Sequence, residues 1–361
     1  MKFAATALAL GAAVQASPLF PEVGSGTDGV TFQTMGTYME KNFDWANFDQ
    51  EVQNAVNAGY NTLYLGFYMS LHGCQGACTA WRDLQPDVKQ DVQSYLKSQN
   101  AYLGLSIGGP GEFIEGVIRD GTTQQFAQEA AQFAWDQGFS AIDIATELSG
   151  SLTQPSVWAL NGSYSAFVST MIKEAKKVGY GADQISLTSP AQYFSPDFVQ
   201  CTSDQIATDS CSNALSYYAL DSRESASDAV SHLNMDMLNE DGNFLSYKQI
   251  FVNDDDYVDP YGYGSWGTGS AVQQIMNINN GIKGAKVSIV KSQNPAESSI
   301  RTGYVDPASL SNWACQANND FGWTGGFVGW TWNNNDGYQT LNWPGQLGAA
   351  CTCLGTDAGC V

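Results

Sequence analysis

The sequence predicts an α/β protein with a single (β/α)8 TIM barrel and an inserted excursion before strand six. Short segments rich in β-branched and aromatic residues alternate with longer segments of helical periodicity along most of the chain. No proline-rich or serine-rich linker divides the 361 residues, and barrels often reach this length as one domain. This alternation favours parallel strands with helices between most of them.

The expected strands and helices follow one another in regular order. The expected strands cover residues 30–38, 61–70, 101–109, 139–147, 184–192, 247–256, 285–293 and 325–332. The expected helices cover residues 45–59, 87–99, 123–138, 164–179, 270–282 and 307–319. Residues 205–243 break the rhythm because they are polar and lack a strict period, so we interpret them as the insertion.

The first 16 residues have the pattern of a secretory signal peptide. Lys2 precedes an apolar run to about Val14, and a small residue follows at Ala16. The run is shorter than the roughly 20 residues that a membrane-spanning helix needs. We therefore expect residues 17–361 to form the mature domain and the protein to be secreted and extracellular.

Eight cysteines suit an oxidising compartment. They are Cys74, Cys78, Cys201, Cys211, Cys315, Cys351, Cys353 and Cys360. The even number favours four disulfides, although the order of the cysteines does not determine their pairing. A bond between Cys201 and Cys211 would close a surface loop, and one between Cys74 and Cys78 a very small loop.

Charge and composition exclude several partners. The chain has 36 acidic and 15 basic residues and a net charge of −21, which repels nucleic acid and anionic membrane surfaces. Its only histidines are His72 and His232, and it has no pair of Cys-x-x-Cys units. We therefore expect no structural zinc, no other metal and no cofactor.

Two carboxylates lie four residues apart on the fourth expected strand. Side chains alternate along a strand, so Asp143, Ala145 and Glu147 share one face. The chemistry of such barrels lies at the carboxyl ends of the strands, where Glu147 is placed. Glu147 and Asp143 are therefore the candidate catalytic residues, with a small alanine between them.

Four motifs follow one another within about residues 30–338: Ser-Ile-Gly-Gly at 106–109, and the segments 185–198, 303–310 and 325–338. Together they resemble glycoside hydrolase family 18, and within it the class III chitinases, and Trp330 in the last segment matches the family's sugar-site tryptophan. The family's strand-four signature is Asp-Gly-x-Asp-x-Asp-x-Glu. Residues 140–147 read Ser-Ala-Ile-Asp-Ile-Ala-Thr-Glu, so they match it at Asp143 and Glu147 only.

The resemblance implies substrate-assisted hydrolysis of β-linked N-acetylglucosamine. Glu147 would protonate the leaving oxygen while the acetamido oxygen of the substrate attacks the anomeric carbon. The family's last strand-four aspartate orients that acetamido group, and Ala145 stands in its place. A family tyrosine at the end of strand six also holds the acetamido oxygen, and the expected strand six has Val252 or Phe251 there. One lost contact of this kind costs about 10²- to 10³-fold in rate, so we expect weak or no hydrolysis.

The candidate substrate-binding residues lie near the ends of expected strands. They are Tyr38, Phe67, Ser106, Gln249, Asn253 and Trp330. The loop at 253–267 combines the run Asp254, Asp255 and Asp256 with four aromatic residues, which can bind the hydroxyl groups and the apolar face of a sugar. The glycosylation sequon at 161–163 is expected in an exposed loop before a helix.

We therefore expect a secreted chitinase-like protein that binds chitin, chito-oligosaccharides or other N-acetylglucosamine-containing glycans. One alternative is an active chitinase or endo-β-N-acetylglucosaminidase with Glu147 as general acid, in which the acidic strand-six loop orients the acetamido group. A second alternative is an inhibitor or effector that binds a protein partner. Aromatic residues lining the carboxyl end of the barrel would favour sugar binding, whereas loops filling it would favour the protein partner.

Overall fold

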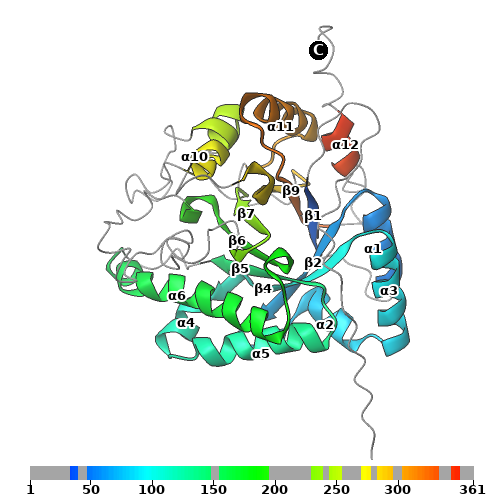
Figure 1. Ribbon diagram of the computed structural model, residues 1–361, viewed down its shortest axis with the longest axis vertical. Coiled ribbons are helices and arrows are strands. Elements are labelled where there is room, and N and C mark those ends of the chain that lie inside the picture. Colours follow the sequence, from blue (N-terminus) through cyan, green and yellow to red (C-terminus); the bar gives the residue numbers. More distant parts are fainter. Residues whose placement is uncertain are drawn as a thin grey trace, which may run out of the picture.

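The computed structural model describes nine stretches of the chain, and these contain one closed barrel (Figure 1). The described stretches are residues 33–39, 47–147, 154–194, 229–238, 244–253, 270–277, 283–295, 303–332 and 343–349. Parallel strands form a ring, which closes because the first strand pairs with both the second and the last. The predicted TIM barrel is confirmed.

Strands and helices alternate along most of the described residues. The strands are β1 (Thr34–Met39), β2 (Thr62–Met69), β3 (Gly73–Cys74), β4 (Tyr102–Phe113), β5 (Ala141–Glu147), β6 (Ile185–Pro190), β7 (His232–Asp236), β8 (Val287–Ser292) and β9 (Gly326–Trp330). The helices are α1 (Phe48–Asn57), α2 (Gly76–Asp83), α3 (Pro86–Ser98), α4 (Ile114–Arg119), α5 (Thr123–Asp136), α6 (Gln154–Val178), α10 (Val272–Met276), α11 (Pro307–Phe321) and α12 (Trp343–Ala349). β3 pairs antiparallel with β2 beside the ring.

Helices surround the ring, with α1 and α3 on one side, α4, α5 and α6 on another, and α10 and α11 on a third (Figure 1). Their ends follow local sequence chemistry. In α11, Pro307 occupies the first turn, the Asp306 carboxylate accepts the N–H of Ser309 at 2.9 Å, and Gly322 ends the helix with a φ of 74°. No helix within the described stretches is long and apolar enough to cross a membrane.

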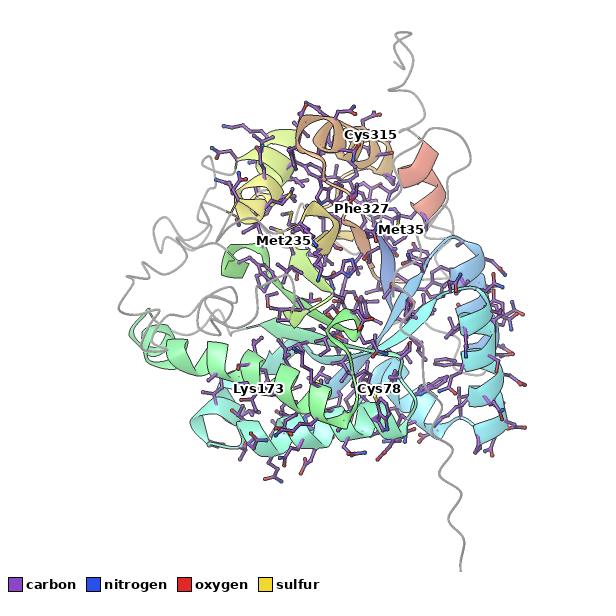
Figure 2. All side chains as sticks on the ribbon, in the orientation of Figure 1. Met35, Cys78, Lys173, Met235, Cys315 and Phe327 are labelled. Atoms are coloured by element: carbon purple, nitrogen blue, oxygen red, sulfur yellow. A yellow bond between two sulfur atoms is a disulfide. The ribbon has the colours of Figure 1, made fainter. Side chains whose placement is uncertain are left out.

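Side chains alternate between the two sides of each strand. Met35, Met235 and Phe327 face outward from three strands and pack in the main core between the ring and the helices (Figure 2). Their neighbours one residue further on or before, such as Asn234 and Val328, face the inside of the barrel. Both sides of the strands are therefore buried, as is usual for a parallel sheet.

The sixth strand of the ring is β7, and the prediction that residues 247–256 form this strand is wrong. Lys248–Val252 instead forms a π-helical turn, η4. Ile250 and Phe251 in this turn are buried in the main core, where the Phe251 ring centroid lies 5.0 Å from that of Trp323. A short apolar run can be buried by a helical turn as well as by a strand, so the run alone did not distinguish them.

β7 lies inside residues 205–243, so the prediction that this whole segment is an insertion is also wrong. Leu233 and Met235 of β7 face the main core, whereas His232 and Asn234 alternate with them on the inner side. The polar inner residues made this strand look like part of a loop. Residues 205–228 and 239–243 lie outside the described residues.

Two covalent predictions can be compared with the structure. Cys74 and Cys78 form a disulfide across Cα atoms 5.3 Å apart, which confirms the very small loop. Cys315 is also disulfide-bonded, whereas the pair Cys201 and Cys211 lies outside the described residues. The sequon at 161–163 lies within α6 rather than in a loop before a helix, because α6 begins earlier than its apolar periodicity indicated.

Lys291 on β8 is a buried cation that joins three segments of the chain. Its Nζ donates to backbone carbonyl oxygens, which belong to Met237 at 2.8 Å, Phe244 at 2.9 Å and Gly303 at 3.1 Å. Gly303 is packed closely, because a Cβ atom there would lie 1.8 Å from the carbonyl oxygen of Leu238. These contacts satisfy the buried ammonium group and fix the chain that follows β7.

His232 should make the stability of the protein depend on pH. Burial, followed by the positive charge of Lys286, lowers the pKa of His232 from 6.5 to about 3. The unfolded chain takes up a proton near pH 6.5, so the contribution of His232 is complete above that pH and is lost as the pH falls toward 3. We expect this residue to lower the free energy of unfolding, measured in urea, by about 1.4 kcal/mol per pH unit in that window.

The matched comparison uses His232→Gln and the exposed-site variant His72→Gln. All other ionisable groups are common to the parent and His232→Gln, so the difference between their free energies of unfolding isolates this residue. The difference in free energy of unfolding between the parent and His232→Gln should narrow as the pH falls from 6.5 to 4. The free energy of unfolding of His72→Gln should change with pH as that of the parent does. A constant difference between the parent and His232→Gln would contradict the assignment.

Candidate functional site

A buried carboxylate organises the inside of the barrel. Asp143 is fully buried on β5, and four hydroxyl groups donate to it. Its Oδ2 accepts from Tyr38 and Ser106 at 2.9 Å each. Its Oδ1 accepts from Ser186 and Thr188 at 2.7 Å each. These donors come from β1, β4 and β6, so the carboxylate connects strands on both sides of its own.

Asn234 of β7 extends this network. Its Nδ2 donates to the Thr188 hydroxyl at 3.0 Å and lies 3.5 Å from the hydroxyl of Tyr64. Burial raises the pKa of the Asp143 carboxyl above its usual value, and the hydroxyl donors oppose this rise because they favour the ionised form. We call this set the polar layer; its members are Tyr38, Tyr64, Ser106, Asp143, Ser186, Thr188 and Asn234.

An apolar layer lies beyond Asp143, nearer to the carboxyl ends of the strands. Ala145 belongs to it, two residues after Asp143, and is 6% exposed. The other members are Phe67, Met69, Leu238, Val290, Val328 and Trp330, which pack with the rings of Tyr38 and Tyr64. The position that the family resemblance assigns to an acetamido-orienting aspartate is therefore a methyl group within an apolar surface.

Trp330 is the half-buried aromatic member of this layer. Its ring centroid lies 5.2 Å from that of Tyr38 and 6.1 Å from that of Phe67, to which it is nearly parallel at 25°. Gly109 permits this arrangement, because its φ is +95° and a Cβ atom there would lie 2.4 Å from the Phe67 ring. The Ser-Ile-Gly-Gly motif thus leaves room for the ring on which Trp330 packs.

β7 places a second carboxylate at the carboxyl end of the barrel. Asp236 is half-buried, and its Oδ1 accepts the backbone N–H of Leu238 at 2.9 Å. The sequence prediction missed Asp236 because it assigned strand six to another segment. The alternating polar and apolar pattern of His-Leu-Asn-Met-Asp could have identified this strand and its last inner residue.

The two predicted catalytic residues lie on the same strand, at different depths. Asp143 is inside the barrel, where its oxygens are occupied by the polar layer. Glu147 ends β5, and its backbone pairs with Phe113 of β4. Trp330 ends β9, so the expectation that it shares the barrel end with Glu147 is confirmed. The side chain of Glu147 lies outside the described residues.

Three predicted substrate-binding residues come together and one lies deeper. Tyr38, Phe67 and Trp330 are adjacent, with Trp330 the most accessible. Ser106 is fully buried and donates to Asp143. Its hydroxyl belongs to the polar layer, so Ser106 does not share the apolar layer of Phe67 and Trp330, and its contact with substrate stays a prediction.

The prediction that Gln249 and Asn253 lie at the end of strand six is wrong. Gln249 Oε1 accepts the N–H of Leu245 at 3.1 Å and the hydroxyl of Ser246 at 3.2 Å, which caps the start of η4. The N–H of Asn253 donates to the carbonyl of Lys248 at 2.8 Å and closes the same turn. Both residues therefore serve a local helical structure.

Because β7 is the sixth strand of the barrel, the position of the family's strand-six tyrosine lies on β7 and not within residues 247–256. Val252 and Phe251 do not occupy it, because both belong to η4. The true sixth strand, β7, contains no tyrosine and ends with Asp236. The rest of the acidic and aromatic loop, residues 254–267, lies outside the described residues, among which no group of three metal-ligating side chains occurs.

Removing the Asp143 carboxylate should destabilise the whole barrel. Asp143→Ala leaves four buried hydroxyls without their shared acceptor, and each such loss costs about 1–3 kcal/mol. We expect the free energy of unfolding in urea to fall by about 3 kcal/mol or more. Asp143→Asn keeps the shape of the side chain and one acceptor oxygen, so its free energy of unfolding should fall by less than that of Asp143→Ala.

The control for this experiment is Asp91→Ala, which removes an exposed carboxylate from α3. This variant should stay within about 0.5 kcal/mol of the parent. An Asp143→Ala protein as stable as Asp91→Ala would contradict a structural role for the polar layer.

No protein-family model matches the chain, and no curated protein matches its sequence. Solved structures do match its fold. A GH18 chitinase from Pseudoalteromonas aurantia aligns with a TM-score of 0.59 and 15% identity over 87% of this chain and 99% of its own. A fungal endo-β-N-acetylglucosaminidase from glycosyl hydrolase family 18 aligns with a TM-score of 0.53 and 16% identity over 86% and 94%.

The same fold also occurs in a protein described as an inhibitor. A xylanase-A-amylase inhibitor protein, XAIP-III, aligns with a TM-score of 0.50 and 14% identity over 88% of this chain and 98% of its own. At these identities the likeness establishes the fold and leaves the function open. The chain therefore has the barrel fold found in family 18 glycoside hydrolases.

Proposed function

We propose that this protein is a secreted member of the family 18 group that binds N-acetylglucosamine-containing glycans, such as chitin oligomers, with weak or no hydrolysis. The observation that carries the proposal is Trp330, a half-buried indole next to Tyr38 and Phe67 at the end of the barrel. An aromatic face with apolar support can stack on the apolar face of a pyranose ring. The motif resemblance and the shared fold support the choice of sugar.

Ala145 supports the second half of the proposal. Catalysis requires contacts that strengthen in the transition state, whereas ground-state binding persists on stacking and neutral hydrogen bonds. A methyl group among Leu238, Val290 and Trp330 supplies no charge to an acetamido group. Binding can therefore survive where the reaction is lost.

The active-enzyme alternative requires Glu147 as general acid and another residue to hold the acetamido group. The inhibitor alternative has one supporting observation, the fold likeness to the xylanase-A-amylase inhibitor protein. It requires a protein partner instead of a glycan. Glycan binding by purified protein distinguishes it from the main proposal.

Trp330→Ala should weaken binding to a chito-oligosaccharide by about 1–3 kcal/mol, because one large apolar contact is lost. Isothermal titration calorimetry with chitohexaose gives the dissociation constants. The matched control is Trp135→Ala on α5, whose indole is 47% exposed on the outside of the barrel. Parent protein that gives no binding at millimolar sugar would rule out the glycan proposal and leave the protein-partner alternative.

Hydrolysis of chitin oligomers should be at least ~10²-fold slower than in a family enzyme with an intact strand-four signature, because one transition-state contact is missing. The release of reducing ends from chitohexaose measures this rate, with Glu147→Gln as the background control. Turnover within about tenfold of the intact enzyme, well short of that loss, would show that another residue performs the missing role.

A further inference from the structure

Two neighbouring layers inside the barrel contain mostly small side chains. They adjoin the polar layer on the side of the amino ends of the strands and share Ser186 with it. Alternate strands contribute to each layer, and bulky branched residues usually fill such layers. One layer contains Gly36, Gly104, Ser186 and Ser288, and the next contains Thr62, Ala141, His232 and Gly326, all of them buried. This part of the barrel is therefore lined by less side-chain volume than is usual.

A large ring fills these layers on one side of the barrel only. A Cβ atom at Gly104 of β4 would lie 2.8 Å from the ring of Tyr64, so that ring occupies the space beside β4. On the opposite side, β8, β9 and β1 contribute only Ser288, Gly326 and Gly36 to the two layers. The wall formed by these three strands is therefore lined by small residues alone.

Three buried oxygens along this wall have no hydrogen-bond partner among the described residues. They are Oγ1 of Thr34, Oδ1 of Asn234 and Oγ of Ser288. All three residues are 0% exposed, so bulk solvent does not reach their side chains. A buried polar atom without a partner costs free energy, and such atoms in native proteins are nearly always bonded to protein or to ordered water. Three of them in one region indicate a bound polar ligand.

Strand register places these three residues in one row. Asn234 of β7 pairs with Ser288 of β8, the row continues from Ser288 to Gly326 of β9, and Gly326 pairs with Thr34 of β1. Four neighbouring strands thus present an amide, a hydroxyl, a glycine and a second hydroxyl in succession. We call these four residues the polar row.

The side chains of the polar row face the inside of the barrel. Their sequence neighbours Met35, Leu233 and Ile289 belong to the main core outside the ring, and side chains alternate along a strand. Ser288 and Thr34 are two strands apart, which is about 10 Å between their backbones, too far for a direct hydrogen bond between two short side chains. The glycine between them leaves the intervening position without a side chain.

We propose that the polar row is a binding site for a chain of buried water molecules inside the barrel, bound by Asn234, Ser288 and Thr34. The row carries no charged side chain, so a neutral ligand fits it. Asn234 Oδ1 can only accept a hydrogen bond, whereas the two hydroxyls can donate or accept. Water supplies both functions and is small enough for the position beside Gly326.

The water chain extends the hydrogen-bond network of Asp143 toward the amino ends of the strands. Asn234 Nδ2 donates to the Thr188 hydroxyl at 3.0 Å, and Thr188 donates to Asp143 at 2.7 Å. A water that donates to Asn234 Oδ1 fixes the amide from its other side. The polar layer is therefore held by protein groups above and by water below, and this site is separate from the surface around Trp330.

The first test is the sign of the stability change in Thr34→Val and Ser288→Ala, measured by urea unfolding. Each substitution removes one hydroxyl at little change in shape. With bound water, each variant loses a buried hydrogen bond, so its equilibrium constant for unfolding should rise about fivefold. Without bound ligand, each substitution removes an unpaired buried hydroxyl, and the variant should be more stable than the parent. More stable variants would overturn the proposal.

The matched control is Thr37→Val, the same substitution on the same strand. The hydroxyl of Thr37 is buried and donates to the carbonyl of Gly329 at 3.3 Å. Its loss measures the effect of one buried hydrogen bond to a protein group, with which the effect of Thr34→Val can be compared.

The second test is a high-resolution crystal structure of the parent protein. We expect ordered water within hydrogen-bond distance of Asn234 Oδ1, Ser288 Oγ and Thr34 Oγ1, and the water at Ser288 should be lost or displaced in crystals of Ser288→Ala. Direct hydrogen bonds among the three side chains, or apolar groups packed against their oxygens, would refute the water site.

Discussion

The structure depends on the Asp143 carboxylate inside the closed barrel. A carboxyl group can be buried at low cost only where hydrogen bonds replace its lost hydration. Hydroxyl groups from β1, β4 and β6 supply them, and Asn234 of β7 connects to the same network. Five strands are thus held at one level by contacts around one side chain.

The polar layer has a consequence for the carboxyl end of the barrel. The polar layer occupies Asp143 and the Tyr38 hydroxyl, and the side chains beyond it are mainly apolar and include Ala145 and Trp330. This surface suits the apolar face of a sugar better than a developing positive charge. Our account therefore separates sugar binding, which the apolar layer supports, from hydrolysis, which needs charge placed at the reacting atoms.

The sequence predicted most strands because both sides of each are buried and the strands appear as apolar runs. It also predicted that Trp330 lies at the same end as Glu147. It failed at the sixth strand, where β7 has polar residues on its inner side. The partners of Asn234, which are Thr188 and Tyr64, lie far away in the sequence, so nothing local marked this residue as buried.

The same error explains most of the misplaced site residues. Gln249 and Asn253 were assigned to the site because residues 247–256 were taken for the sixth strand. Ser106 was assigned from a motif, but its depth in the barrel depends on the Asp143 contact, which no spacing in the sequence reveals. Asp236 was missed for the converse reason, since its strand was taken for an insertion.

A crystal structure of the protein with bound chitotetraose tests our central claim most directly. We predict a pyranose ring stacked on the Trp330 indole, with intact glycosidic bonds and the acetamido group beside Ala145. A sugar bound elsewhere on the protein, with Trp330 covered by a loop of the chain, would contradict the account.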